Sequence, residues 1–340
     1  MDYSALSPTL RVMLGIACFV VVVAGMKAAT EILVPFLLSA FIATLCAPAL
    51  MWLESRRVPT TLAVVLVVLV VVLTVGGFSM VVAASINDFA KQVPGYQARL
   101  LQETEAVTTW LAGHGVELSQ QMVKEQINPG KVMDMVRKVV TGFGNVLTDF
   151  FLIFLTVLFI LFEASSFPVK FRRAMGEQHR SLAAFEQFNA SVKEYLIIKT
   201  LVSIGTGLFI GIWLWIQGLD YVALWALLAF LLNFIPNIGS IIAAVPAVLL
   251  SFVQFGFGGA GITALGFFIV NIVMGNIIEP RFMGKGLGLS TLVVFLSLLF
   301  WGWVLGPVGM LLSIPLTMIV KLALESNQES HWLAVLLGNK

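Results

Sequence analysis

Long apolar segments are the feature that most constrains the fold of this chain. A helix that crosses a lipid bilayer needs roughly 20 apolar residues, and the segments of about that length are 10–27, 31–53, 61–85, 146–163, 197–217 and 260–278. Charged residues make up only 11% of the 340 residues, against about 25% in soluble domains. Because so few charges cannot cover a water-facing surface, lipid must be the solvent for much of the chain. The sequence predicts an all-α, polytopic integral membrane protein with about six full transmembrane helices.

The charge and motif content exclude several classes of protein. The formal net charge is +2, and the basic residues occur in short clusters, so no nucleic-acid partner is expected. The sequence contains no metal-ligand spacing, phosphate-binding loop, nucleophile elbow or catalytic triad. We therefore expect no enzyme activity, no cofactor, no metal and no ATP hydrolysis in this chain.

The distribution of lysine and arginine predicts the orientation in the membrane. The 164–199 segment is rich in basic residues and has an apolar stripe at helical spacing, which is typical of an amphipathic helix at the inner leaflet. Segment 86–145 has balanced charges and helical patterns of its own, and it fits the outer face. Both termini are then predicted to be cytoplasmic.

Two further apolar runs are too long for one crossing, and each is interrupted near its middle. Run 221–254 is broken at Pro236 to Gly239, and run 287–322 is broken at Gly306 to Gly309. Each half is shorter than the roughly 20 residues that a full crossing needs. Both runs continue to a second proline, so the same sequence pattern occurs twice in the second half of the chain.

The doubled break allows two topologies. If each hairpin re-enters the membrane, the first opens from outside and the second from inside, which makes an inverted repeat. Alternatively, both are ordinary helix pairs with turns at the surfaces, which gives ten crossings with the same termini. We favour re-entry because the breaks occupy corresponding positions. A helix broken inside a bilayer exposes backbone groups that a ligand, water or protein must satisfy, and transporters bind their substrates at such breaks.

Polar residues gather near these breaks, where an unpaired asparagine would be costly. Glu279 and Arg281 could pair with each other, gate the pathway or mark the membrane interface. For Asn237 and Asn276, the alternatives are contact with a substrate or the opposite break, and simple helix packing. The predicted substrate-binding or pathway residues are Asn233, Pro236, Asn237, Gly239, Ser240, Asn271, Asn276, Glu279, Arg281, Gly306, Pro307 and Gly309.

The stretch NFIPNIGS (233–240) and the EPR (279–281) and GPVG (306–309) motifs resemble the autoinducer-2 exporter family, and the likeness covers nearly the whole chain. The resemblance implies a bacterial inner-membrane protein that exports the small, polar quorum-sensing signal autoinducer-2 and so affects biofilm formation. It also implies a homo-oligomer, with a pentamer as the expected form.

The resemblance does not fix the solute, since some relatives are linked to sodium–proton antiport. An antiporter needs a titrating acid, for which Glu163 and Glu279 are the candidates. A third alternative is a structural or permeability-control protein without specific transport.

Five regions are predicted along the chain. They are N-terminal transmembrane helices (1–85), an extracytoplasmic helical module (86–145), a transmembrane helix with a basic cytoplasmic segment (146–199), a core transport region with the two broken hairpins (200–325) and a cytoplasmic tail (326–340).

Overall fold

The computed structural model describes residues 7–113, 150–164, 170, 179–236, 238–282, 289–325 and 330–338. In these residues the regular secondary structure is helical, which confirms the predicted all-α class. The chain divides into two compact units, one of residues 1–47, 152–188 and 288–340 and the other of residues 48–151 and 189–287. Each unit is described by itself below.

Several described helices have the length and composition of membrane spans. Five are long and apolar enough to cross a bilayer: Thr30–Ser55, Thr60–Ser85, Ala190–Gln217, Gly239–Phe282 and Thr291–Leu311. Shorter apolar helices cover Met13–Ala28, Phe151–Glu163 and Val222–Leu232. This pattern agrees with a multi-pass membrane protein.

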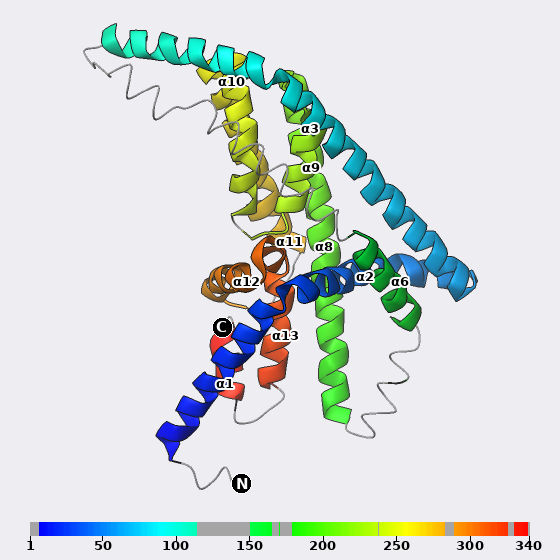
Figure 1. The fold of residues 1–340 in the computed structure, drawn as a ribbon. Coiled ribbons are helices and arrows are strands. Elements are labelled where there is room, and N and C mark those ends of the chain that lie inside the picture. The colour runs from blue at the N-terminus through cyan, green and yellow to red at the C-terminus, as the bar shows by residue number, and fades with distance from the viewer. Residues whose placement is uncertain are drawn as a thin grey trace. The chain divides into compact units, whose positions relative to one another are not determined.

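The first unit contains α1 (Pro8–Ala28), the first part of α2 (Thr30–Ser55) and most of α6 (Phe150–Ala164). It also contains α12 (Thr291–Leu311), α13 (Ser313–Glu325) and α14 (His331–Leu337), as Figure 1 shows. Ser7 begins α1 as an N-cap, because its side chain accepts a hydrogen bond from the Leu10 amide. The core of this unit forms where α1 packs against α12, around Val23, Trp301, Val304 and Leu305.

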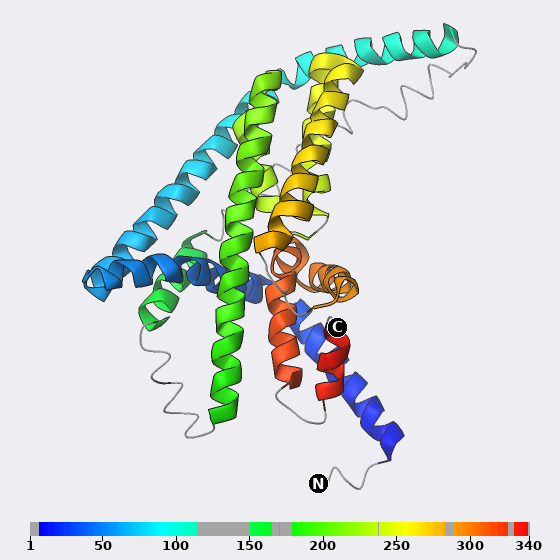
Figure 2. The same ribbon diagram turned by 180° about the vertical axis from the view of Figure 1, so that it is seen from behind.

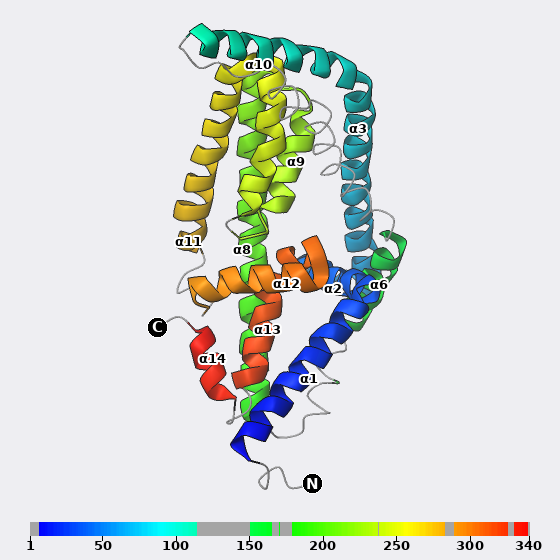
Figure 3. The ribbon, with the colours of Figure 1, turned by 60° about the vertical axis from the view of Figure 1, so that its left-hand side comes forward.

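The second unit contains α3 (Thr60–Gly113), most of α8 (His179–Gln217), α9 (Val222–Leu232) and α10 (Gly239–Asn271). A π-helix, η2 (Ile272–Ile278), and the short α11 (Glu279–Phe282) follow α10 without a break. The core of this unit is larger and centres on Trp225 of α9, which is fully buried. Figure 3 shows α8, α9 and α10 side by side.

Two predicted boundaries prove to be continuous helix. The third span and the start of the predicted outer module form one helix, α3, whose second half is bent relative to the first (Figure 2). The predicted amphipathic segment and the following span likewise form one helix, α8. The rest of the predicted outer module, 114–145, lies outside the described residues.

Candidate functional site

The first predicted break is a tight turn between α9 and α10. Helix α9 ends at Leu232, and α10 begins at Gly239. The 11 residues of α9 span only about 16 Å at 1.5 Å per residue, roughly half of the hydrocarbon thickness of a bilayer. The first arm of this hairpin is therefore too short to cross a membrane alone.

A second interruption separates this hairpin from the next span. Gly256 has φ 68° and ψ −161°, a conformation open to glycine, so α10 consists of two helices. The Gln217 side chain bridges these halves by donating hydrogen bonds to Ser251 Oγ at 3.1 Å and to the Gly259 carbonyl at 2.9 Å. Figure 3 shows the chain turning back within α10. The expected separation of 221–254 from 260–278 is confirmed.

The second predicted break lies inside α12. Gly306 has φ 69° and ψ −152°, which interrupts the helix immediately before Pro307. The chain then returns along its first arm, because the Trp301 indole N–H donates a hydrogen bond of 3.0 Å to Thr317 Oγ1 of α13, and both side chains are buried. The second hairpin is therefore a closed helical pair held by a buried polar contact.

Gly239 and Gly309 occupy equivalent positions in the two hairpins. A Cβ on Gly239 would meet the Leu232 carbonyl oxygen of the first arm, and a Cβ on Gly309 would meet the Trp301 carbonyl oxygen. In each case it would also meet the side chain four residues earlier, Ile235 or Leu305. The repeated glycine in the two sequence patterns thus has a structural cause, since both hairpins need glycine where the returning arm touches the backbone of the first arm.

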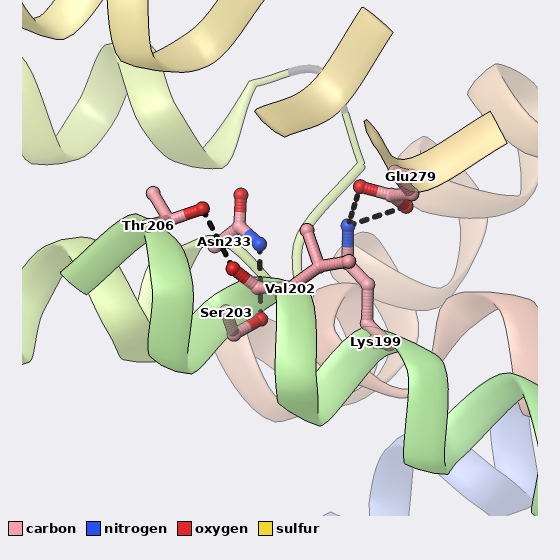
Figure 4. A network of polar contacts seen from close by, with 6 residues as sticks. All are labelled: Lys199, Val202, Ser203, Thr206, Asn233 and Glu279. Atoms are coloured by element: carbon pink, nitrogen blue, oxygen red, sulfur yellow. Dashed lines mark hydrogen bonds and ion pairs between the residues drawn. The ribbon is translucent and has the colours of Figure 1, made fainter. Parts of the chain in front are cut away.

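Helix α8 presents polar side chains to the first hairpin. Lys199, Ser203 and Thr206 follow the spacing i, i+4 and i+7, so they lie on one face of the helix, and all three are buried. We call these three residues the polar face of α8 (Figure 4). The Asn233 amide, at the end of α9, donates a hydrogen bond of 2.9 Å to Ser203 Oγ. Thr206 donates to the Val202 carbonyl of its own helix at 2.9 Å.

The same face also holds a buried ion pair. Lys199 Nζ lies 2.7 Å from Oε1 and 2.8 Å from Oε2 of Glu279, the first residue of α11. The two side chains are only 5% and 18% exposed. Burying an ion pair in an apolar helix bundle is costly, which makes the Lys199–Glu279 pair a candidate functional site. The structure thus brings the first break and the EPR motif together on α8.

The other predicted residues of the second unit are distributed around this centre. Ser240 and Pro236 are half-buried near the turn, and Asn271 is half-buried at the end of α10. Asn276 and Arg281 are exposed. Asn237 lies outside the described residues.

In the first unit, Gly306 and Gly309 lie at the second break as predicted, while Pro307 is exposed. Glu163, the other candidate acid, forms an exposed ion pair with Lys170 at 2.6 Å. Among the described residues, no group of three His, Cys, Asp or Glu side chains is arranged to hold a metal ion.

The three residues of the polar face are not among the site residues predicted from the sequence. From the sequence, Lys199 belongs to the basic cytoplasmic segment and Arg281 is the candidate partner of Glu279, whereas in the structure Glu279 pairs with Lys199. A signal was available, because Lys199, Ser203 and Thr206 are polar residues at helical spacing in an apolar helix.

Comparison with known proteins identifies relatives over nearly the whole chain. Residues 16–328 match the family described as AI-2E family transporter. The chain is 40% identical over 332 residues to the AI-2 transport protein TqsA of Escherichia coli (strain K12), covering 97% of this chain and 96% of TqsA. It is also 42% identical over 336 residues to a putative transport protein of Haemophilus influenzae, covering 97% of this chain and 96% of that protein. It is 36% identical over 329 residues to the putative transport protein YhhT of Escherichia coli (strain K12), covering 97% and 94%. This chain belongs to the AI-2E family of transporters and is a multi-pass membrane transport protein.

Proposed function

We propose that this protein exports autoinducer-2 across the bacterial inner membrane without hydrolysing ATP itself. The observation that carries the proposal is the 40% identity to the AI-2 transport protein TqsA over 97% of the chain. Export would lower the intracellular level of the signal, which connects the protein to quorum sensing and biofilm formation.

The chemistry of the candidate site supports a small, uncharged, hydroxyl-rich solute. Asn233 and Ser203 offer an amide and a hydroxyl, which can donate and accept hydrogen bonds. The charge of Lys199 is balanced by Glu279, so the polar face presents no net charge. A neutral solute can then exchange hydrogen bonds with the site without having to neutralise a buried ion.

The remaining predicted pathway residues belong to the same proposal. Asn237, Ser240, Asn271 and Asn276 would extend the polar lining from the first break towards the EPR motif. Gly306, Pro307 and Gly309 would provide the corresponding break in the second hairpin. Arg281 would line the cytoplasmic mouth of the pathway.

We further propose the topology and the assembly predicted from sequence. Both hairpins re-enter the membrane as an inverted repeat, both termini are cytoplasmic, and the chain forms a homo-oligomer, with a pentamer as the expected form. The short first arm of the first hairpin supports re-entry, since 11 residues do not span a bilayer.

Reconstituted vesicles test the substrate assignment. Wild-type protein should move labelled autoinducer-2 down its gradient. Asn233→Leu should reduce the flux by about tenfold, because it removes the amide and its hydrogen bonds. Thr74→Val serves as the control, since the exposed Thr74 hydroxyl donates to the Val70 carbonyl of its own helix, α3. Absence of autoinducer-2 flux with the wild type would refute the assignment.

A sodium–proton antiporter is the second candidate, and the buried Lys199–Glu279 pair is the observation that favours it. In that case Glu279 would bind the cation or proton. When neither is bound, the ammonium group of Lys199 would take the place of the cation beside Glu279. Vesicles containing a pH-sensitive dye and given sodium pulses distinguish the two functions. An antiporter should give a pH change that Glu279→Gln abolishes, whereas an exporter of a neutral solute should give none.

A further inference from the structure

A π-helix stands directly before Glu279. Residues 272–278 form η2, and the Glu279 amide N–H bonds to the Met274 carbonyl, five residues back, as in a π-helix. Such helices are rare and occur frequently at functional sites. Because each residue of an α-helix turns by about 100°, conversion of η2 to α-helix would rotate Glu279 away from its present direction.

Two contacts with α8 hold η2 in this form. At one end, Glu279 pairs with Lys199. At the other, the buried Met274 packs against Gly205, where a Cβ would lie only 2.5 Å from Met274 Cε. The order of the contacts, 199 with 279 and 205 with 274, means that η2 runs antiparallel to α8. The π-helix is therefore fixed on α8 by one electrostatic contact and one steric contact.

Both contacts flank the Asn233–Ser203 hydrogen bond. Ser203 lies one helical turn beyond Lys199 and two residues before Gly205. Asn233 and Ser203 are 8% and 0% exposed, so water does not reach this pair freely. In the conformation observed, the two side chains proposed to bind the solute, Asn233 and Ser203, are hydrogen-bonded to each other (Figure 4). Glu279, which follows η2, contacts the same stretch of α8.

We propose that the Lys199–Glu279 ion pair is a latch that keeps the Asn233–Ser203 site closed, and that the site opens when η2 leaves its π register and withdraws Glu279 from Lys199. The latch rests on the transport function proposed above, because it regulates access to the same site. Separation leaves Lys199 as an uncompensated buried charge, which favours closure. The closed state is therefore the resting state, and opening requires that another group or water solvate Lys199.

Chemical accessibility tests the latch without any solute. Thr206→Cys, on the same buried face, is introduced after Cys18 and Cys46 have been replaced by alanine, and its reaction with a water-soluble maleimide is timed. Glu279→Gln removes the charge of the latch, and Gly205→Ala displaces Met274 while keeping every charge. Each should raise the labelling rate by about tenfold, because the rate is proportional to the fraction of molecules in which the site is open.

Matched controls separate the latch from general loosening. Glu325→Gln alters the i, i+4 ion pair between the exposed Glu325 and the half-buried Lys321, and Gly76→Ala adds a methyl group where nothing lies within 4 Å. Both should leave the labelling rate within about twofold of wild type. The exchanged pair Lys199→Glu/Glu279→Lys restores the opposite charges and should return the rate towards wild type.

The outcomes decide between the two proposals. Labelling at the wild-type rate in both Glu279→Gln and Gly205→Ala overturns the latch. So does an exchanged pair that labels as fast as Glu279→Gln, since loss of packing and not loss of charge would then be responsible. If labelling follows the latch but wild-type vesicles never move autoinducer-2, the substrate assignment fails and the latch stands.

Discussion

The Tyr96 hydroxyl donates a hydrogen bond of 2.8 Å to Oδ2 of Asp220, and this contact joins the extension of α3 to the turn between α8 and α9. Tyr96 is 3% exposed, and its ring packs against that of Phe89, 5.8 Å away between centroids. Asp220 is itself held in place, because its amide donates to Gln254 Oε1 at 3.1 Å and its carbonyl accepts from the Trp225 indole at 2.9 Å. The base of the first hairpin is thus fixed to α3 beyond the segment that could cross the membrane.

Tyr96→Phe should loosen this attachment. The substitution keeps the aromatic packing and removes one hydrogen bond to a carboxylate, which is worth about 1.5–3 kcal/mol. We expect a lower thermal midpoint in detergent and faster proteolysis within the α3 extension. Lys91→Met is the control, because the Lys91–Asp88 pair is exposed and such pairs contribute little. Equal proteolysis of the two variants would contradict the attachment.

Tyr96 should also make the folded protein less stable at alkaline pH. Burial, reinforced by the hydrogen bond to Asp220, raises the pKa of Tyr96 above its ordinary value of about 10. The unfolded chain then loses the phenol proton at a lower pH than the folded chain. The contribution of Tyr96 is therefore fully present below about pH 10 and is lost as the pH rises above it. Thermal midpoints measured from about pH 8 to 11 should fall more steeply for wild type than for Tyr96→Phe.

Alanine at either hairpin glycine should be strongly destabilising. A Cβ at Gly239 or Gly309 would meet a carbonyl oxygen of the opposite arm, so the arms must separate. The expected cost is about 3 kcal/mol, at the upper end for overpacking. Gly261→Ala is the matched control, because nothing lies within 4 Å of its Cβ position. Thermal unfolding in detergent measures the difference, and equal midpoints for Gly239→Ala and Gly261→Ala would refute the close contact.

Substitutions in the Asn233–Ser203 pair should affect stability and transport differently. Ser203→Ala leaves a buried amide without its acceptor and should cost about 1–3 kcal/mol. Adding Asn233→Leu removes that unsatisfied amide, so the double variant should regain most of the stability. Its autoinducer-2 flux should nevertheless stay about tenfold below wild type. Recovery of flux together with stability would show that the pair has only a structural role.

The positions of the two breaks could be predicted from sequence because proline and glycine act locally. Proline removes a backbone donor, and only glycine tolerates the backbone angles found at Gly306. The helical nature of 86–113 could also be predicted, since Phe89 and Tyr96 keep a helical spacing and now lie on one buried face. The partner of Glu279 could not be predicted in this way, because Lys199 is 80 residues away in the chain.

The sequence by itself determined that this chain enters a membrane as helices and that two of its apolar runs are broken. Composition and local backbone chemistry suffice for both conclusions, since neither depends on which helices become neighbours. Only the tertiary structure decided which polar residues meet. It placed Asn233 on Ser203 and Glu279 on Lys199 across a single face of α8. Such pairs depend on how helices distant in sequence pack together, and the packing of Gly205 against Met274 is part of what fixes that arrangement.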